Sequence, residues 1–508
     1  MKHALTSKSK HKTKAPCIAV LGTGSDVGKS IITTALCRLF ANRGVRVAPF
    51  KAQNMSNNSG VTPEGLEMGR AQIVQAEAAR IPPHVDMNPV LLKPTADIGS
   101  QIVLLGSAIE TGKTGAAHGD NERLFREACD ALDRVRQEYD LIILEGAGSC
   151  AEVNLMSHDI VNFRMAAYAD APILLVADID RGGVFAQIIG TLECLKQNQR
   201  AQISGFIINR FRGDLHLFQD GVRWIEEKTK KQVFGVLPWY SHIRIEPEDA
   251  VVIESPQKAN VKNSQTPAVA VIRLPHISNF TDFDPLLALN KLEVYFLEKV
   301  QPLADFKAVI LPGSKNTRFD LNWILSSGWR EALSEYLTAG GYVLGICGGY
   351  QMMGKAIHDP TGLEGQPGSS EGLDLLPIET VLKSPKTTTL TRFSWNGQQG
   401  AGYEIHMGQT IRAGGNHLFH IIERNNSSCQ DEDGCISSDS KIMGTYIHGL
   451  FDNPTILKFW LNHIGLSEIE VSDVGGIEAR NQEYDLLADH LEEYVDVERI
   501  AQLVENRG

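Results

Sequence analysis

Short apolar runs that alternate with segments of helical periodicity are the feature that most constrains how this chain folds. The runs are CIAVLG, VRVAPF, DLIILEG, APILLVAD, ISGFIINR and VFGVLP before residue 254, then AVAVIRL, KAVILPG and GYVLGIC after residue 267. Runs of this kind predict strands buried on both faces, as in parallel sheets that helices cover on each side. The pattern therefore predicts an α/β fold of two doubly wound parallel-sheet domains.

The boundary between the two series is a polar stretch with no apolar period, ESPQKANVKNSQTP at residues 254–267, which is typical of a linker. We therefore expect a first domain at 15–253 and a second at 268–508 that includes a C-terminal amphipathic helix. Residues 1–14 are basic and predict a disordered leader. Within the second domain, residues 358–372 and 424–439 are rich in loop-forming residues and predict surface loops.

Composition excludes several classes of protein. The chain has 508 residues, is 43% hydrophobic and carries a net charge of -12, which disfavours a nucleic-acid or anionic-membrane partner. No apolar run has the length of a signal peptide core or a membrane span, so we expect a cytoplasmic enzyme. The eight cysteines form no C-x-x-C pair and the histidines do not cluster, which argues against a disulfide framework, a structural zinc site or a tightly bound cofactor. The oligomeric state stays open, a homo-oligomer included.

GTGSDVGKS, at residues 22–30, lies between a predicted strand and a predicted helix. Glycines there turn backbone N–H groups towards phosphate, and the lysine and the helix N-terminus favour negative charge. This P-loop is one residue longer than the usual pattern, and the alternative is a glycine turn with an incidental lysine. The motif predicts ATP binding by Gly22, Thr23, Gly24, Asp26, Val27, Gly28, Lys29 and Ser30.

Polar residues follow other strands of the first domain, at the edge where ligands of open α/β sheets bind. Glu145 ends the run DLIILE and, with Ser30, is a candidate Mg²⁺ ligand; the alternative is a solvated carboxylate at a loop edge. Asn209, in IINRFRGD, is a candidate contact for adenine. The polar cluster after VRVAPF predicts substrate contacts by Lys51, Gln53, Asn54 and Asn57, although such a cluster is also typical of an ordinary loop.

In the second domain, GICGGYQ follows a predicted strand and places Cys347 in a glycine-flanked turn. A nucleophile elbow of this kind exposes a side chain at the carboxyl end of a sheet, beside a helix N-terminus. A lone cysteine is as often a small buried hydrophobic residue, so the choice between a buried thiol and a nucleophile depends on two further segments. LPGSKNT predicts an oxyanion site at Gly313 and Ser314, to which Gly348 of the elbow contributes, and GTYIHGLF supplies His448 as the base.

These motifs carry a family resemblance. GTGSDVGKS with LEGAGS resembles dethiobiotin synthetase, a P-loop enzyme that activates a carboxylate with the γ-phosphate of ATP. The order of strand, oxyanion loop, cysteine and late histidine resembles the class I glutamine amidotransferases. Many of those carry a glutamate two residues after the histidine, whereas this chain has Leu450. Asp452 or Glu404 are alternatives for orienting His448, and a Cys–His dyad is a third.

Two other acidic segments gain no role from the resemblance alone. HISNFTDFDPL holds Asp282 and Asp284 just after the linker, and a loop that tethers the domains explains them without chemistry. GYEIHMG holds Glu404 and His406 on a predicted strand, where structural support near the cysteine is the plain interpretation.

The combination resembles the cobyrinic acid amidating enzymes, most strongly the cobyric acid synthase family, over about residues 15–465. The resemblance implies amidation of the b, d, e and g carboxylates of adenosylcobyrinic acid a,c-diamide, with glutamine, ATP and Mg²⁺. The reaction would pass through an acyl phosphate and release ADP and phosphate. Two alternatives stay open: a cobyrinic acid a,c-diamide synthase, and a nucleotide-gated regulatory protein with an inactive amidotransferase-like domain.

Overall fold

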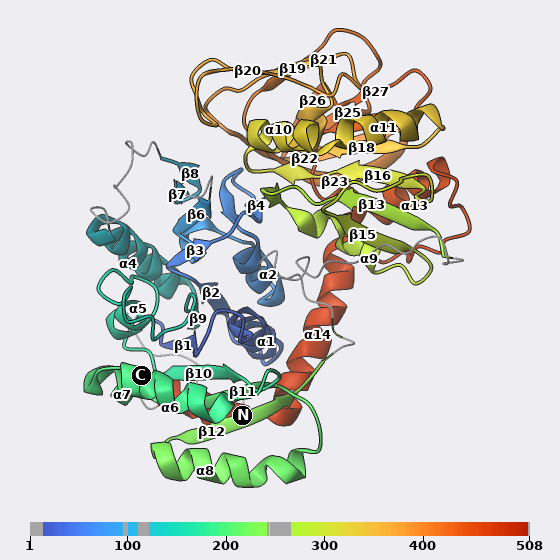
Figure 1. The fold of residues 1–508 in the computed structure, drawn as a ribbon. Coiled ribbons are helices and arrows are strands. Elements are labelled where there is room, and N and C mark those ends of the chain that lie inside the picture. The colour runs from blue at the N-terminus through green and yellow to red at the C-terminus, as the bar shows by residue number, and fades with distance from the viewer. Residues whose placement is uncertain (1–13, 95–99, 110–120, 241–242, 244–265, 506–508) are drawn as a thin grey trace.

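A computed structural model describes residues 14–94, 100–109, 121–240, 243 and 266–505 of the chain. They form two α/β domains, each built on a sheet that is wholly or mainly parallel, which confirms the predicted fold class. In Figure 1 the first domain, blue to green, lies below the second, yellow to orange. Most of the predicted leader (1–14) and of the predicted linker (254–267) lies outside the described residues, and the predicted domain bounds stay predictions.

The first domain is built on six parallel strands in the order β12-β11-β10-β1-β9-β2. Alternate side chains of β1 enter different cores: Cys17, Ala19 and Leu21 one, Ile18 and Val20 the other. This is why its sequence is apolar throughout, since both faces of the sheet are covered. The strands are β1 (Cys17–Gly22), β2 (Val47–Phe50), β9 (Leu141–Glu145), β10 (Ile173–Asp178), β11 (Ile203–Phe211) and β12 (Gln232–Pro238).

Amphipathic helices cover the two faces of this sheet. In α4, Ala128, Leu132 and Val135 are buried at helical spacing while the charged residues between them face outwards, which is the pattern of a helix lying on a core. The helices are α1 (Lys29–Asn42), α2 (Arg70–Ala78), α4 (Asn121–Glu138), α5 (Phe163–Tyr168), α6 (Val184–Cys194), α7 (Gln197–Gln202) and α8 (Gln219–Thr229).

Short strands after β2 extend the first domain towards the second (Figure 1). Four form a small sheet and two form a pair that leads directly into α2, and β4 of this pair contacts β22 and β23 of the second domain. The small sheet contains β3 (Gln53–Met55), β6 (Val90–Pro94), β7 (Ser100–Leu104) and β8 (Ser107–Ala108), and the pair is β4 (Ser59–Val61) with β5 (Glu67–Gly69).

The second domain has a six-stranded sheet in the order β15-β13-β16-β18-β28-β27, parallel except for β27. Its strands are β13 (Ala268–Ile272), β15 (Glu293–Leu297), β16 (Ala308–Leu311), β18 (Val343–Ile346), β27 (Cys435–Ile436) and β28 (Ile442–Thr445). The helices are α9 (Asp284–Leu287), α10 (Thr317–Ser327), α11 (Trp329–Thr338), α12 (Gly348–Met352) and α13 (Pro454–His463).

Two further four-stranded sheets occupy much of residues 356–433. Of the two predicted loops, 358–372 is irregular over residues 360–367 and strand only at its ends, whereas most of 424–439 forms strands. A two-residue turn explains the difference at 424–439, because Asn425 and Asn426 both have positive φ, as a type I′ hairpin requires. Asn396–Gly397 forms a similar turn earlier in the same sheet. One sheet contains β19 (Ala356–Asp359), β20 (Gly368–Glu371), β21 (Ile378–Val381) and β24 (Gln409–Arg412). The other contains β22 (Thr387–Trp395), β23 (Gln398–His406), β25 (Phe419–Arg424) and β26 (Ser427–Asp433).

The chain ends in α14 (Gly476–Tyr494) and α15 (Val497–Glu505), which return to the first domain. We expected the C-terminal helix to belong to the second domain, but in Figure 1 the red α14 runs beside α1. Leu487 and Leu491 are buried in the core that β1 and α1 share, and the buried Arg38 of α1 donates hydrogen bonds to Asp485. The helix is amphipathic as predicted, but its apolar stripe completes the first domain.

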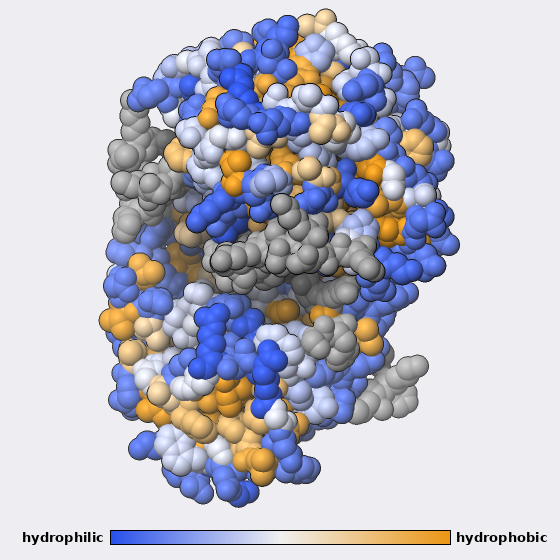
Figure 2. Space-filling view, turned by 45° about the vertical axis from the view of Figure 1, so that its right-hand side comes forward, coloured by the Kyte–Doolittle hydropathy of each residue, from blue (hydrophilic) through white to orange (hydrophobic). Residues whose placement is uncertain are grey.

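Hydrophilic side chains cover much of the face shown in Figure 2, and smaller groups of hydrophobic side chains lie among them on both domains. No helix in the described part of the chain combines the length and the apolar character needed to cross a bilayer.

Candidate active sites

Cys347 lies in a sharp turn between β18 and α12, with φ of 52° and ψ of -107°. Glycines make the turn feasible: a Cβ on Gly349 would lie 2.1 Å from Leu311 O, and one on Gly345 would lie 2.3 Å from Met353 Sδ. Cys347 is 6% exposed, and its Sγ lies 3.6 Å from Ile405 O. The strained backbone and the flanking glycines are those of a nucleophile elbow.

The predicted oxyanion residues converge on this turn. Gly313 and Ser314 form β17, which pairs with β14 (Ile277–Ser278). A Cβ on Gly348 would lie 2.8 Å from Ser314 N, and one on Gly313 would lie 3.1 Å from His448 Cε1. The loop after β16 therefore packs directly against both the elbow and the histidine, where backbone donors can stabilise an oxyanion.

His448 follows β28 and is 1% exposed. Its Nδ1 lies 2.7 Å from Asp282 Oδ2, and Gly449 N donates to Asp282 Oδ1 at 2.8 Å, so one carboxylate fixes both the ring and the backbone. Its Nε2 has no hydrogen-bond partner among the described residues. Burial lowers the pKa of His448, but Asp282 and Cys347 outweigh burial and raise the pKa to about 10. The imidazolium form is thus stabilised beside the thiol.

Sequence reasoning missed Asp282. The two candidates it offered are engaged elsewhere: Glu404 Oε1 accepts from Arg424 Nε at 3.1 Å, and Asp452 pairs with Arg480 at 3.3 Å. Asp282 lies 166 residues before His448, and no local motif links the two. The contact between Asp282 and His448 therefore identifies Asp282 as the third member of a Cys–His–Asp arrangement.

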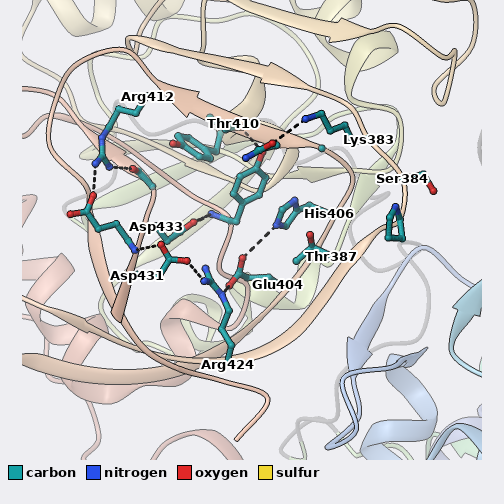
Figure 3. Close-up of a pocket in the computed structure, with 17 residues that line it drawn as sticks. Lys383, Ser384, Thr387, Glu404, His406, Thr410, Arg412, Arg424, Asp431 and Asp433 are labelled. Atoms are coloured by element: carbon teal, nitrogen blue, oxygen red, sulfur yellow. Dashed lines mark hydrogen bonds and ion pairs between the residues drawn. The ribbon is translucent and has the colours of Figure 1, made fainter. Parts of the chain in front are cut away.

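GYEIHMG contributes Glu404, His406 and Gly408 to the lining of a cavity of about 730 Å³, shown in Figure 3, which Tyr350 of α12 also lines. Burial alone would raise the pKa of Glu404, but His406 and Arg424 lower it to about 2. His406 stacks on Tyr446 with ring centroids 3.7 Å apart, and Tyr446 OH accepts from Gln351 Nε2 at 3.0 Å. Gln351 lies on α12 one turn after the cysteine, so this segment braces the elbow, as the structural interpretation predicted.

The P-loop joins β1 to α1 and brings its predicted residues together. Gly28 has φ of 94°, and Lys29 Nζ lies 2.8–3.0 Å from the carbonyls of Gly24, Ser25 and Gly148. Asn209, the candidate adenine contact, is fully buried and donates to Val27 O at 3.0 Å. Its position braces the loop, and contact with adenine stays a prediction.

Ser30 and Glu145 meet at the end of the P-loop. Ser30 Oγ donates to Glu145 Oε1 at 2.9 Å, and Lys51 Nζ donates to the same oxygen at 2.7 Å. Gln75 of α2 donates to the other oxygen. A hydroxyl and a carboxylate at a phosphate-binding loop are the hard oxygen ligands that Mg²⁺ prefers, so these residues fit that ion.

The other predicted substrate residues lie around α2. Asn54 Nδ2 donates to Gln72 Oε1 at 3.0 Å, and Gln53 is half-buried on β3. Several buried polar atoms in this region have no hydrogen-bond partner within the described residues, which marks a place for a polar ligand or water. They are Thr23 Oγ1, Asn57 Oδ1, Gln72 Nε2 and Gln75 Oε1.

Comparison with known proteins gives matches to both domains. Residues 18–251 match the family model "CobQ/CobB/MinD/ParA nucleotide binding domain", and residues 268–456 match "CobB/CobQ-like glutamine amidotransferase domain". The cobyric acid synthase of Chlorobium phaeobacteroides (strain BS1) is 49% identical over 499 residues, covering 96% of this chain and 99% of that protein. The cobyric acid synthase of Chlorobaculum tepidum is 48% identical over 496 residues, covering 95% and 97%. A solved structure, PurLQS from Thermotoga maritima, matches at 13% identity with a TM-score of 0.29, covering 45% and 99%.

Proposed function

The chain belongs to the cobyric acid synthase family, and from that premise we propose that it amidates the b, d, e and g carboxylates of adenosylcobyrinic acid a,c-diamide. Membership makes it a ligase of cobalamin biosynthesis with an ATP-binding domain and a glutamine amidotransferase domain. The observation that carries the proposal is the near full-length match, which keeps both sites in one chain.

The second domain supplies ammonia. Cys347 Sγ attacks the side-chain amide carbon of glutamine while the backbone of Gly313, Ser314 and Gly348 stabilises the oxyanion. His448 passes a proton to the departing nitrogen, and Asp282 holds the ring in the required tautomer. The C–N bond breaks, ammonia leaves and a thioester remains. Water, activated by His448, hydrolyses the thioester to glutamate and restores the thiol.

The first domain activates the carboxylate. A carboxylate oxygen of the corrinoid attacks the γ-phosphorus of ATP, ADP leaves and an acyl phosphate forms. Lys29 neutralises phosphate charge, and Ser30 and Glu145 would hold Mg²⁺. When bound, the ion stabilises charge on the transferring phosphoryl group. Ammonia then attacks the acyl carbon, phosphate departs with the carboxylate oxygen, and the nitrogen loses one proton to give the amide.

Mass spectrometry tests the proposal directly. The protein is incubated with ATP, Mg²⁺, adenosylcobyrinic acid a,c-diamide and glutamine labelled with nitrogen-15 in its side-chain amide. A product with four labelled amides is expected. Glutamate release without labelled corrinoid would contradict the proposed substrate. In a parallel incubation with unamidated cobyrinic acid, the addition of two labelled amides would assign the a,c-diamide synthase reaction instead.

Two variants test whether the second domain releases ammonia and the first domain activates the carboxylate. Cys347→Ala should abolish glutamine-dependent amidation and leave amidation with added ammonium intact, because the first domain does not need the thiol. Lys29→Ala should abolish amidation with either nitrogen source, because both need the activated carboxylate. Amidation by Lys29→Ala with ammonium would contradict the P-loop assignment.

A further inference from the structure

A cavity of about 620 Å³ lies where the two domains meet, and both line it. Cys347, Ser314 and Gln351 form part of its wall from the second domain, and Lys93 and Gln101 form part from the first. Ammonia released at the thiol would therefore enter a space that residues of both domains line.

Two lysines in this wall share one carboxylate across the domain interface. Glu67 of β5 accepts from Lys93 Nζ at 2.7 Å, from Lys386 Nζ at 2.8 Å and from Ser59 Oγ at 2.7 Å. The side chains of Lys93, Lys386 and Glu67 are 4%, 10% and 2% exposed. A single cation would neutralise Glu67, so this cluster carries one positive charge in excess.

Lys315 places a third amine in the same cavity, directly after the oxyanion residue Ser314. Its Nζ donates to Gln101 Oε1 of the first domain at 3.0 Å. Burial, together with Lys386 and Lys93, lowers the pKa of Lys315 to about 7. Burial also lowers the pKa of Lys93 to about 8, against the opposing effect of Glu67. At neutral pH Lys93 is therefore mostly protonated and Lys315 about half protonated, and the positive charge of this wall rises as the pH falls below about 7.

Ammonia and ammonium respond differently to such a wall. Neutral ammonia carries no charge to be repelled, whereas ammonium meets cations in a site that water screens poorly. Ammonium also lacks the lone pair that attacks an acyl phosphate, so a protonated nitrogen is lost to the reaction. The acidic groups that face the lysines are Glu67, which is already shared, and Glu364 of the cavity lining, whose pKa burial raises.

We propose that Lys93, Lys315 and Lys386 form a lysine collar that lets ammonia cross from Cys347 to the first domain and excludes ammonium. The collar keeps the released nitrogen in its reactive form and keeps ammonium of the solvent out of the cavity. This inference rests on the proposed function, because it requires that the first domain consume the nitrogen released by the second.

The test follows the origin of the amide nitrogen. Wild type and variants receive nitrogen-15 glutamine together with unlabelled ammonium chloride, and the unlabelled fraction of the product amides is measured. Lys93→Met and Lys315→Met, singly and together, should raise the ratio of unlabelled to labelled amide about tenfold or more. With a positive charge removed from a poorly screened site, ammonium enters the cavity, loses its proton to water there and supplies unlabelled ammonia. Lys93→Arg and Lys315→Arg should keep the wild-type ratio or lower it, since arginine is always charged whereas Lys315 is only partly protonated.

A control variant tests whether the effect is specific to lysines of the cavity. Lys383→Met removes an exposed lysine three residues before Lys386 and should leave the ratio unchanged. Glutamate release close to the wild-type rate shows that a Met variant is folded. If Lys93→Met does not fold, Lys315→Met still allows the test, because it loses only one contact, to an amide. An equal rise in Met and Arg variants would assign the lysines to packing and overturn the collar. A raised KM for the corrinoid with an unchanged ratio would assign them to substrate carboxylates and also overturn it. Wild type that amidates with neither nitrogen source would instead refute the proposed function.

Discussion

Asp282 fixes His448 through contacts to both the ring and the next backbone amide, so its removal should damage the glutaminase site without unfolding it. Asp282→Asn replaces the acceptor for Nδ1 and favours the wrong tautomer. We expect kcat for glutamate release to fall about 10²- to 10⁴-fold. Stopped assays of glutamate release measure this, and amidation with ammonium should stay near wild type.

The matched control for this substitution is Asp284→Asn, two residues further along the chain and half-buried at the start of α9. It should retain glutamate release within a small factor. An equal loss in both variants would mean that the segment acts only by holding the fold, and a Cys–His dyad would then describe the site.

The sequence predicts Cys347 and His448 because each lies in a short motif whose local backbone exposes a side chain. Asp282 has no such motif: a hydrogen bond to a residue 166 positions away depends on how β14 and β28 come together. Asn209 shows a similar limit, since its position after a strand predicts exposure at the sheet edge, whereas its amide is buried against the P-loop. Local pattern predicts a nucleophile; tertiary packing decides which groups orient it.

At the scale of elements, α14 is the helix for which the sequence does not determine the domain that it packs against. Its stripe of apolar residues predicts burial but does not name the partner surface, because a stripe of similar width fits either domain. Contacts with α1 and α2 decide the matter, including the Arg38–Asp485 pair. The hairpin with its turn at Asn425–Asn426 shows a different limit: its polar residues predict a surface loop, whereas the two positive-φ asparagines connect two paired strands.

The packing of α14 predicts a sharp contrast within one helix. Leu491 is fully buried in the core of the first domain, and Leu486 is 46% exposed. Leu491→Ala should lower the free energy of unfolding of that domain by about 2–5 kcal/mol. Leu486→Ala should change it by less than about 0.5 kcal/mol. Denaturant unfolding monitored with ATP present and absent measures both, and similar costs would mean that α14 does not complete this core.

At the scale of the whole molecule, the interface between the domains runs close to both active sites. Asn279 Oδ1 accepts from Ser59 N at 3.1 Å, three residues before Asp282, and Glu67 lies three residues before α2 begins. Helix α2 in turn presents Gln75 to Glu145. The same short segments therefore hold the domains together and position side chains of the two sites, so a change in docking is felt at both.

Arg480 of α14 allows this connection to be tested away from either site. It contacts Glu77 of α2 at 2.9 and 3.1 Å and Asp452, four residues after His448, at 3.3 Å. Arg480→Met removes the bridge, and we expect the ratio of glutamine-dependent to ammonium-dependent amidation to fall by a factor equivalent to about 0.5–2 kcal/mol. Arg499→Met, on the exposed side of α15, should leave the ratio unchanged. Ammonium-dependent amidation should persist in Arg480→Met because the P-loop and Glu145 are intact. If the glutamine-dependent and ammonium-dependent rates fell together, the bridge would act on the first domain alone. The Glu67–Lys386 and Ser59–Asn279 contacts would then be the ones that align the two domains for nitrogen transfer.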